Sequence, residues 1–511
     1  MSSLQPKDAA AVILLRQKTD PDNPEVFWVK RSPKLVFLGG FYAFPGGQAE
    51  PADPEAPIEN CGDDRERAAM ISCAAREMFE ETGVLLARGS ETLTVGQRSS
   101  LLDDLESGRM PWPEMLKHYG LHLDANDFTF VGRWVTPPFA PRRFDTWFFL
   151  VNCPPKQEPH VTGDAELASG EWISACDAYK KWGRNEILAA PPVLHTLKVL
   201  AGGLTHDLVE RFLSVPEAHR QVTQRMEFRQ NYICFPVRTP TKPPATHTNA
   251  YLIYTSRELL IIDPGSPYEE EQRALAECTD DLIAEGRIVR EIVLTHVHPD
   301  HVAGVSALNE HLQSKHALRV PVAAHRLTAE SLKHQFAVDR HIEDNEVISL
   351  DGEPAIRMQA LFTPGHARGH LCFYDEARGV LISGDNVVGF GSVLIDPADG
   401  NMSEYLDSLR RMRSLPNVTV LLPGHGPAVA NPHDKIDQYI EHRLEREANI
   451  LTAVREGAST PAEIVARVYT DVNPKALPMA ERAVLAHLEK LIEDGLVRKD
   501  TESFYAQCPT M

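Results

Sequence analysis

The chain of 511 residues is too long for a single hydrophobic core, so we expect several domains. Its composition, with 43% hydrophobic and 24% charged residues, is that of an ordinary soluble globular protein. The net charge of −20 opposes general attraction to phosphate backbones or anionic membranes, although a local basic groove stays compatible with it.

The first part of the chain is predicted to combine strands and helices. A helix that starts near Asp64 should end at Gly83, because glycine suits a C-terminal cap. The apolar periodicity fades around residues 215–228, so we place a domain boundary there. The expected strands cover 9–15, 26–31, 129–135 and 144–151, and the expected helices cover about 64–82 and parts of 174–214.

A second α/β pattern follows, and its polar residues come directly after apolar strands. These residues are Asp263, His296, His325, Asp385 and His425. Loops at strand ends are held rigidly by the sheet and are favoured positions for ligand sites. The expected strands cover 250–254, 259–262, 291–294, 321–324, 380–383 and 418–422.

The last part is predicted to contain a long amphipathic helix over about 432–456. It is followed by a helix that Thr460 opens, a helix over 479–494 and a hairpin over 496–507, an order typical of a winged-helix module. The complete prediction is three domains, at 1–215, 229–430 and 431–511.

The eight cysteines are scattered and form no Cys-x-x-Cys pair, so we expect reduced thiols rather than a disulfide or thiolate–metal framework. The apolar run from Ala9 to Leu15 is too short to span a bilayer, and no basic leader or cleavage site accompanies it. We therefore expect a cytoplasmic location and no membrane partner.

The segment His296-Val-His298-Pro299-Asp300-His301 supplies four ligand-type side chains within six residues. Two zinc ions about 3.5–4 Å apart require neutral imidazoles and carboxylates on a rigid frame. His296 and His298 can point the same way from an extended turn, and Pro299 then directs Asp300 and His301 elsewhere. One loop could therefore serve two adjacent metals. The alternative is a surface loop that is polar by chance, and a cluster of this density seldom arises by chance.

Three more ligand-type residues stand in turn or strand-end motifs: His366 in Thr-Pro-Gly-His, Asp385 in Leu-Ile-Ser-Gly-Asp and His425 in Leu-Pro-Gly-His-Gly. With these motifs, residues 229–508 resemble the metallo-β-lactamase superfamily. The resemblance implies a four-layer αββα sandwich with a di-metal site at one edge.

The same resemblance implies a role for each residue. Zinc is the first choice of metal, and iron or manganese use the same ligands in relatives. The ions would share a hydroxide nucleophile that Asp300 could steer, and His370 would contact substrate or support the site. By motif, the first metal takes His296, His298 and His366, the second takes Asp300, His301 and His425, Asp385 bridges both, and Asp263 orients the ligands.

Within the superfamily, the chain resembles a lactamase-β-like group that includes single-strand endoribonucleases and thioesterases. The features concerned are the segment around Asn249, the closing Pro-Gly-His-Gly-Pro motif and the helix with His442-Arg443. The same site chemistry serves phosphodiesters and thioesters, so the bond attacked stays open. We expect an acyl-CoA-like thioester, with single-strand RNA as the alternative, and the negative net charge leans away from RNA.

In the first domain, Glu77, Glu80 and Glu81 share one helix face, where they repel one another. Mg²⁺ or Mn²⁺ would neutralise such a group and hold a pyrophosphate, whereas a solvated acidic face is the alternative. The nonapeptide that begins at Arg76 resembles the second part of the Nudix box. Residues 1–215 thus resemble a Nudix hydrolase, an α/β/α sandwich in which Glu80 and Glu81 would be catalytic.

This box departs from the usual pattern. The usual spacing would place a glutamate at position 68, where the chain has Ala68, and about 28 residues separate Gly47 from Arg76, so the box carries an insertion. Peroxisomal coenzyme A diphosphatases have a similarly interrupted box, and the segment around Arg142 and Arg143 is similar to that group. These arginines are candidate phosphate contacts, with a structural salt bridge as the alternative.

The two resemblances together predict a bifunctional hydrolase, with a Nudix pyrophosphatase joined to a di-zinc thioesterase. The expected partner is a small molecule with a phosphate or thioester group, such as coenzyme A or its acyl thioester. Three alternatives stay open: a Nudix half that only binds and regulates, RNA as the partner, and a homodimer.

Overall fold

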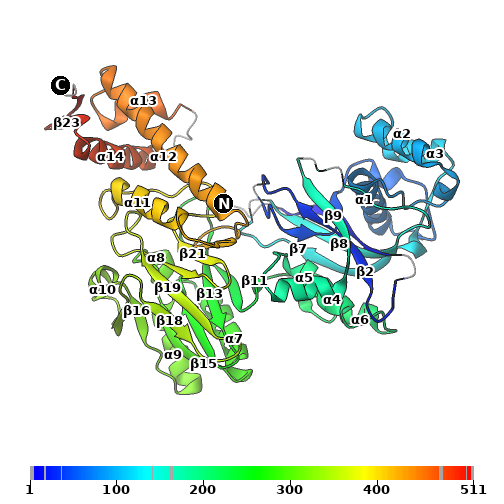
Figure 1. Cartoon of the computed structure of the whole chain (residues 1–511), viewed down its shortest axis with the longest axis horizontal. Helices are drawn as coiled ribbons and strands as arrows, with labels where there is room; N and C mark the ends of the chain where they lie inside the picture. Colours follow the sequence, from blue (N-terminus) through cyan, green and yellow to red (C-terminus); the bar gives the residue numbers. More distant parts are fainter. Residues whose placement is uncertain are drawn as a thin grey trace. The chain divides into compact units, whose positions relative to one another are not determined.

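The computed structural model describes residues 5–16, 19–35, 37–140, 142–161, 163, 165–470, 476–501 and 503–507 (Figure 1). The chain divides into two compact units, Met1–Gln230 (unit 1) and Asn231–Met511 (unit 2). Pro141 and the final segment that begins at Cys508 lie outside the described residues. Within the described part, no helix combines the length and the apolar character needed to cross a membrane.

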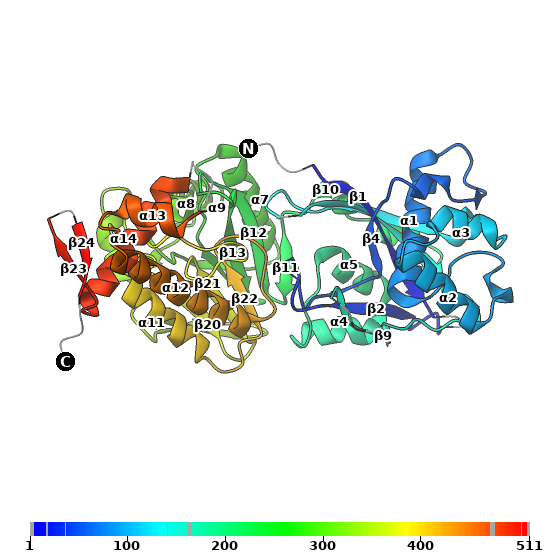
Figure 2. The ribbon, with the colours of Figure 1, turned by 90° about the horizontal axis from the view of Figure 1, so that it is seen from above.

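Unit 1 is an α/β/α sandwich around one mixed sheet. The apolar strand β1 lies inside the sheet, and its side chains alternate between two cores. Ala10, Val12 and Leu14 pack with helices α1, α2 and α3, whereas Ile13 and Leu15 pack with α4, α5 and α6 on the other face (Figure 2). The strand order is β10-β7-β8-β1-β2-β3, with β4 beside β1 and β9 beside β2.

The bounds in unit 1 agree with the expected strands and helices. Helix α1 begins where Asp64 accepts the Arg67 N–H and ends at Gly83, whose φ of 70° is the left-handed conformation that favours glycine. The elements are β1 (Lys7–Leu15), β2 (Glu25–Arg31), β3 (Tyr42–Ala43), β4 (Gly46–Gln48), β5 (Ile58–Glu59), α1 (Arg65–Thr82), α2 (Val95–Glu106), α3 (Trp112–His118), β6 (Leu123–Asp124), β7 (Thr129–Val135), β8 (Phe144–Asn152), β9 (Leu167–Ser174), α4 (Ala175–Gly183), α5 (Pro191–Leu200), α6 (Leu208–Phe212), β10 (His219–Val222) and β11 (Met226–Arg229).

Unit 2 contains the expected αββα sandwich. One sheet runs β12-β13-β14-β15-β16-β17 and packs against α7, α9 and α10, and the other runs β18-β19-β20-β21-β22 and packs against α11 and α12. The elements are β12 (Tyr232–Arg238), β13 (His247–Tyr254), β14 (Glu258–Ile262), α7 (Glu269–Ala284), β15 (Ile288–Val293), α8 (Pro299–Val302), α9 (Val305–His316), β16 (Val322–Ala324), α10 (Arg326–Leu332), β17 (Arg340–His341), β18 (Val347–Leu350), β19 (Ile356–Phe362), β20 (Leu371–Asp375), β21 (Val380–Gly384), α11 (Met402–Arg413), β22 (Val420–Pro423) and α12 (Pro432–Arg455).

Five strands of unit 2, β12 and β17 to β20, are not among the strands expected from the sequence. Strand β12 contains Pro236, which argues against a strand on sequence grounds. Strand β18 has only four residues, and β19 alternates buried and more exposed positions rather than forming a continuous apolar run. Hydrogen bonds between neighbouring strands, rather than local apolar content, define these elements.

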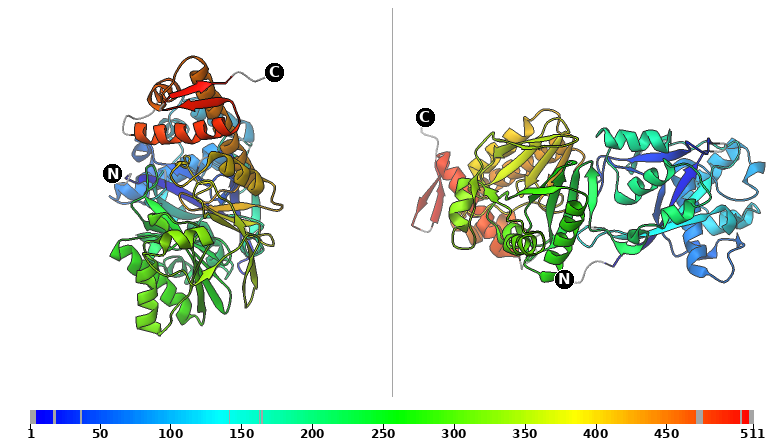
Figure 3. Two further views of the ribbon diagram at one scale, coloured as in Figure 1. Left: turned by 90° about the vertical axis from the view of Figure 1, so that its left-hand side faces the viewer. Right: turned by 90° about the horizontal axis from the view of Figure 1, so that it is seen from below.

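The end of the chain has the predicted order of elements. Helices α13 (Pro461–Val468) and α14 (Leu477–Glu493) precede a hairpin of β23 (Val497–Asp500) and β24 (Ser503–Ala506), which Figure 3 shows beside α14. Thr460 caps α13 and forms a capping box with Glu463. These elements share a core with the end of α12, so the helix and the module form one packed body.

Candidate functional site

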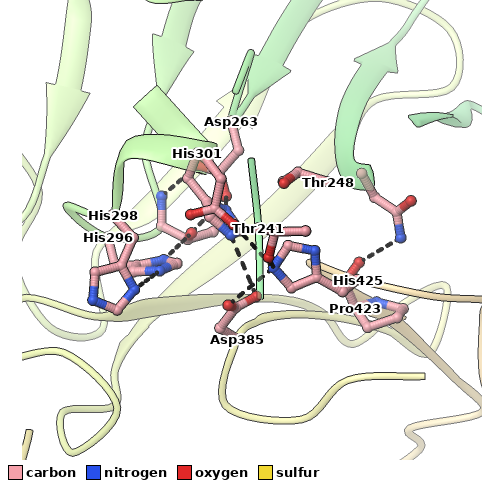
Figure 4. A network of polar contacts seen from close by, with 12 residues as sticks. Thr241, Thr248, Asp263, His296, His298, His301, Asp385, Pro423 and His425 are labelled. Carbon is pink, nitrogen blue, oxygen red and sulfur yellow. Dashed lines mark hydrogen bonds and ion pairs between the residues drawn. The ribbon is translucent and has the colours of Figure 1, made fainter. Parts of the chain in front are cut away.

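The predicted ligands of unit 2 meet at one edge of the sandwich, where parallel strands end. Strands β14 and β15 run parallel in one sheet, and β21 and β22 run parallel in the other, so their carboxyl ends face the same region. Figure 4 shows five of the predicted ligands pointing toward one another: His296, His298, His301, Asp385 and His425. His296 follows β15, His298 precedes α8, Asp300 and His301 lie in α8, His366 follows β19, Asp385 follows β21 and His425 follows β22.

Three imidazoles form the first group. The His298 Nδ1 atom lies 3.0 Å from His296 Nε2 and 3.1 Å from His366 Nε2. A tetrahedral zinc ion with nitrogens at 2.0–2.1 Å has ligands about 3.3 Å from one another. These three nitrogen atoms are therefore spaced as the ligands of one zinc ion would be.

The second group consists of Asp300, His301 and His425, and Asp385 lies between the two groups. The His425 Nε2 atom is 3.4 Å from Asp300 Oδ2 and 3.2 Å from Asp385 Oδ2. Asp385 Oδ1 is 3.4 Å from His301 Nε2, and its Oδ2 is 3.6 Å from His366 Nε2. A carboxylate in this position can contact both metals at once.

The buried polar atoms of the site fit divalent cations. Among the described residues, His301 Nε2 and Asp385 Oδ1 are buried without a hydrogen-bond partner, a costly state that a cation between them would relieve. Asp385 also packs so tightly that a Cβ atom on Gly424 would lie 2.3 Å from its Oδ1 atom. The donor set of imidazoles and carboxylates is the set that zinc prefers.

Burial and neighbouring charges shift the pKa values of the imidazoles in opposite directions. Burial lowers the pKa of His366 to about 3 and, with the neighbouring His301, that of His296 well below its usual value. Burial acts to lower the pKa of His301 and His425 as well, but neighbouring carboxylates led by Asp385 outweigh it. The pKa of His301 is therefore raised well above its usual value, and that of His425 is raised to about 10. Protons and cations would therefore compete for the lone pairs of His301 and His425.

Most ligand imidazoles use their second ring nitrogen to contact an oxygen atom. His301 Nδ1 lies 2.8 Å from Asp263 Oδ2, which places the predicted orienting aspartate directly behind a ligand. The Nδ1 atoms of His366 and His425 contact the backbone carbonyl oxygens of Leu394 and His247. These oxygen partners fix the tautomer in which each Nε2 lone pair points into the site.

His370 supports the site from behind. It is fully buried, and its Nε2 atom accepts the backbone N–H of Asp385 at 3.2 Å. Its Nδ1 atom lies 3.1 Å from the Thr363 hydroxyl oxygen. Of the two roles expected for His370, this position agrees with support for Asp385 and leaves no surface for substrate contact.

In unit 1, the carboxylates of α1 gather around Arg76. The Arg76 guanidinium donates from Nη1 to Glu77 at 2.9 Å and to Glu80 at 2.8 Å. Glu81 accepts the Gly46 N–H at 2.9 Å, and a Cβ atom on Gly47 would lie 2.4 Å from the Glu77 carboxylate. Burial raises the pKa of Glu77 to about 7 and that of Glu81 to about 8. A cation would favour their charged forms.

The predicted site residues of unit 1 do not converge as closely as those of unit 2. Unlike the ligands of unit 2, the three carboxylates do not bring oxygen atoms within 4.8 Å of one another as one set. Arg142 is exposed, and Arg143 is buried and donates to the Thr136 carbonyl oxygen at 3.0 Å. Arg143 therefore makes a structural contact with the backbone, which is not itself the salt bridge expected as its alternative, whereas the side chain of Arg142 is open to solvent.

Sequence reasoning missed Asp53, which pairs with Arg76. Asp53 is buried and accepts from the Arg76 Nε atom at 3.1 Å and from Nη2 at 3.2 Å. The interpretation that the box lacks its acidic residue, based on Ala68, misplaced the insertion. Counted forward from Gly47, the acidic position after five residues is Asp53, and the insertion lies between Asp53 and Arg76.

We expect Asp53→Asn to lower the free energy of unfolding of unit 1 by about 3 kcal/mol, because it takes from a buried guanidinium the buried carboxylate that accepts two of its hydrogen bonds. Denaturant unfolding followed by tryptophan fluorescence measures this, since all six tryptophans lie in unit 1. Glu50→Gln is the matched control: Glu50 is 60% exposed and 3.9 Å from Arg76, so its loss should change the value by less than about 0.5 kcal/mol. Equal losses in both variants would contradict the assignment.

Comparison with known protein families agrees with this geometry. The family model of the metallo-beta-lactamase superfamily matches residues 243–425, that of the beta-lactamase associated winged helix domain matches 460–505, and that of the NUDT19 Nudix domain matches 65–200. The predicted fold of each part is thereby confirmed.

Three relatives match the region of unit 2. A beta-lactamase-like protein 2 homolog of Caenorhabditis elegans is 29% identical over 252 residues, which cover 49% of this chain and 80% of the relative. The lactamase-like protein adaB of Aspergillus niger is 30% identical, with coverage of 49% and 76%. The atrochrysone carboxyl ACP thioesterase of Aspergillus fumigatus is 29% identical, with coverage of 43% and 68%.

The chain therefore belongs to the metallo-β-lactamase superfamily, and it carries a Nudix domain before and a winged-helix domain after the metallo-β-lactamase domain. It is a hydrolase, and both hydrolase families generally bind divalent metals.

Proposed function

We propose that unit 2 hydrolyses an acyl-CoA-like thioester at a di-zinc site and that unit 1 cleaves the diphosphate of a substrate such as coenzyme A. The observation that carries the proposal is the convergence of ligand-type atoms from both sheets at spacings of 3.0–3.6 Å. The name of the similar Aspergillus fumigatus protein, a thioesterase, supports a thioester over a phosphodiester. The domain limits 1–215, 229–430 and 431–511 remain part of the proposal.

When bound, two zinc ions would supply a hydroxide nucleophile and polarise the attacked carbonyl, and Mg²⁺ or Mn²⁺ in unit 1 would hold a diphosphate. The chain's own residues would hold and orient these groups. His298 and Asp300 have the most exposed side chains of the seven ligands, at 33% and 14%, so substrate would approach from their side. No disulfide joins the cysteines of the described residues, which supports a reducing compartment such as the cytoplasm.

The test is to incubate the full chain, supplied with zinc and magnesium, with acyl-CoA, coenzyme A and a labelled single-stranded RNA in parallel. We expect free thiol from acyl-CoA, 4′-phosphopantetheine from coenzyme A and intact RNA. Cut RNA with intact acyl-CoA would replace the thioesterase proposal by the endoribonuclease alternative. If none of the three substrates is cleaved, both readings are overturned.

A further inference from the structure

His298 differs from the other ligands in how its second ring nitrogen is supported. Its Nδ1 atom faces the first metal group, so its Nε2 atom points away from that group. On that side, Asp399 Oδ2 lies 3.5 Å from His298 Nε2. This oxygen is buried and has no hydrogen-bond partner among the described residues. The two atoms are thus matched as donor and acceptor, and Asp399 is not a member of the groups of candidate ligand atoms that lie within 4.8 Å of one another.

The loop that carries Asp399, residues 396–401, is fixed by its own backbone and by the loop of His366. The Asp396 carbonyl oxygen accepts the N–H of Asp399 at 3.0 Å and that of Gly400 at 2.6 Å. The Asn401 N–H donates to the Gly365 carbonyl oxygen at 2.9 Å. A Cβ atom on Gly400 would lie 2.4 Å from that same oxygen, so the close approach of the two loops requires glycine. Asp399 is therefore held in place relative to the metal group.

Helix α14 of the winged-helix domain contacts both ends of this loop. Arg482 donates to the Asp396 carboxylate, with Nε at 3.0 Å from Oδ1. At the other end, Glu493 accepts from the Asn401 side chain at 3.3 Å and from the Ser403 hydroxyl at 2.6 Å. Removal of these contacts would leave the loop with its backbone bonds and with the caps that its own Asp396 and Asn401 side chains provide. The winged-helix domain thus supports a loop that borders the metal group.

We propose that Asp399 is a positioning residue that accepts the His298 Nε2–H and thereby fixes the tautomer in which Nδ1 faces the first metal, and that α14 holds Asp399 in place. The inference rests on the proposed di-zinc site and assigns the winged-helix domain a structural part in it. A carboxylate behind a ligand imidazole fixes the ring orientation and raises the basicity of the ligating nitrogen.

The test measures zinc affinity of the full chain by competition with a chromophoric chelator, a readout that needs no substrate. We expect Asp399→Ala to weaken the binding of one zinc ion about 10- to 100-fold. Asp399→Asn should weaken it less, because its side-chain oxygen can still accept the Nε2–H. Arg482→Gln should weaken it by at most about fivefold, since the ion pair is half-exposed.

Arg413→Gln is the matched control for Arg482→Gln. Arg413 pairs with Asp437 at 2.7 Å with similar exposure, but it joins α11 to α12 away from the 396–401 loop, and its loss should leave zinc affinity unchanged. Wild-type affinity in Asp399→Ala would overturn the proposal, and equal effects of the two arginine variants would overturn the part played by α14. Wild-type chain that binds two zinc ions but cleaves no substrate would refute the proposed function and leave this inference intact.

Discussion

Replacement of Asp385 by alanine is expected to reduce bound zinc from two ions per chain to one or none and to slow thioester hydrolysis by about 10³-fold or more. The Asp385 carboxylate lies 3.2 Å from His425 Nε2 and 3.6 Å from His366 Nε2, so its loss would remove a ligand from both metals of the proposed site. Lewis-acid stabilisation is worth several kcal/mol, which sets the scale of the loss. Elemental analysis after gel filtration and a thiol-release assay measure the two effects.

Asp280→Asn is a control of similar chemistry. The Asp280 carboxylate accepts from His311 at 3.0 Å and from Lys315 at 2.7 Å, on α7 and α9, and its partners already satisfy it. The variant should keep two zinc ions and the full rate. An Asp385→Ala chain with two zinc ions and an unchanged rate would show that Asp385 is not the bridging ligand.

Replacement of Glu81 by glutamine is expected to slow coenzyme A diphosphate cleavage by about 10²- to 10⁴-fold, the range for a lost acid–base group. Glutamine keeps the shape of the side chain and can still accept the Gly46 N–H, but it removes the charge that would bind a cation. Phosphopantetheine release measures the loss, and thiol release by unit 2 should be unchanged. Glu66→Gln, at the exposed start of the same helix, is the control and should keep the full rate.

The same variant should be more stable than wild type when divalent cations are chelated. Burial raises the pKa of Glu81 to about 8 in the folded chain, above its ordinary value of 4.5. Between these pH values the folded state binds more protons than the unfolded state, so the stability of wild-type unit 1 should fall as pH rises from 5 to 8. In Glu81→Gln this fall should be smaller by a few kcal/mol, as tryptophan fluorescence during denaturation would show. Identical pH profiles would contradict the assignment.

The parts of the fold that were predictable are those with a strong local pattern. The run Lys7–Leu15 and the capped helix Arg65–Thr82 have one dominant signal each, and their bounds were predicted within one or two residues. Strand β12 was missed because Pro236 suppresses the strand signal, although β13 pairs with it along its whole length. Partners in a sheet come from distant parts of the chain, so local pattern alone could not supply them.

The candidate ligands could be named from motifs, as could Asp263 and His370 behind them, but the other contacts that orient the imidazoles could not. Two of the atoms that orient the imidazoles are the carbonyl oxygens of Leu394 and His247, and a backbone atom leaves no mark in a sequence. Asp399 is 101 positions from His298, and only the folded loop brings them together. Asp53, by contrast, was predictable: counting from the glycine side of the interrupted box would have found it.

The positions of the candidate ligands along the chain also determine when the site can be completed during synthesis. His296 to His301 leave the ribosome as one group, but His425 follows more than a hundred residues later. Unit 1 is complete before any of them emerges and can fold first, because domains fold as units during synthesis. Until β22 has joined its sheet, the site still lacks His425, although His366 and Asp385 of the second sheet have already been made. Full metal loading is therefore confined to the last stage of translation or to the finished chain.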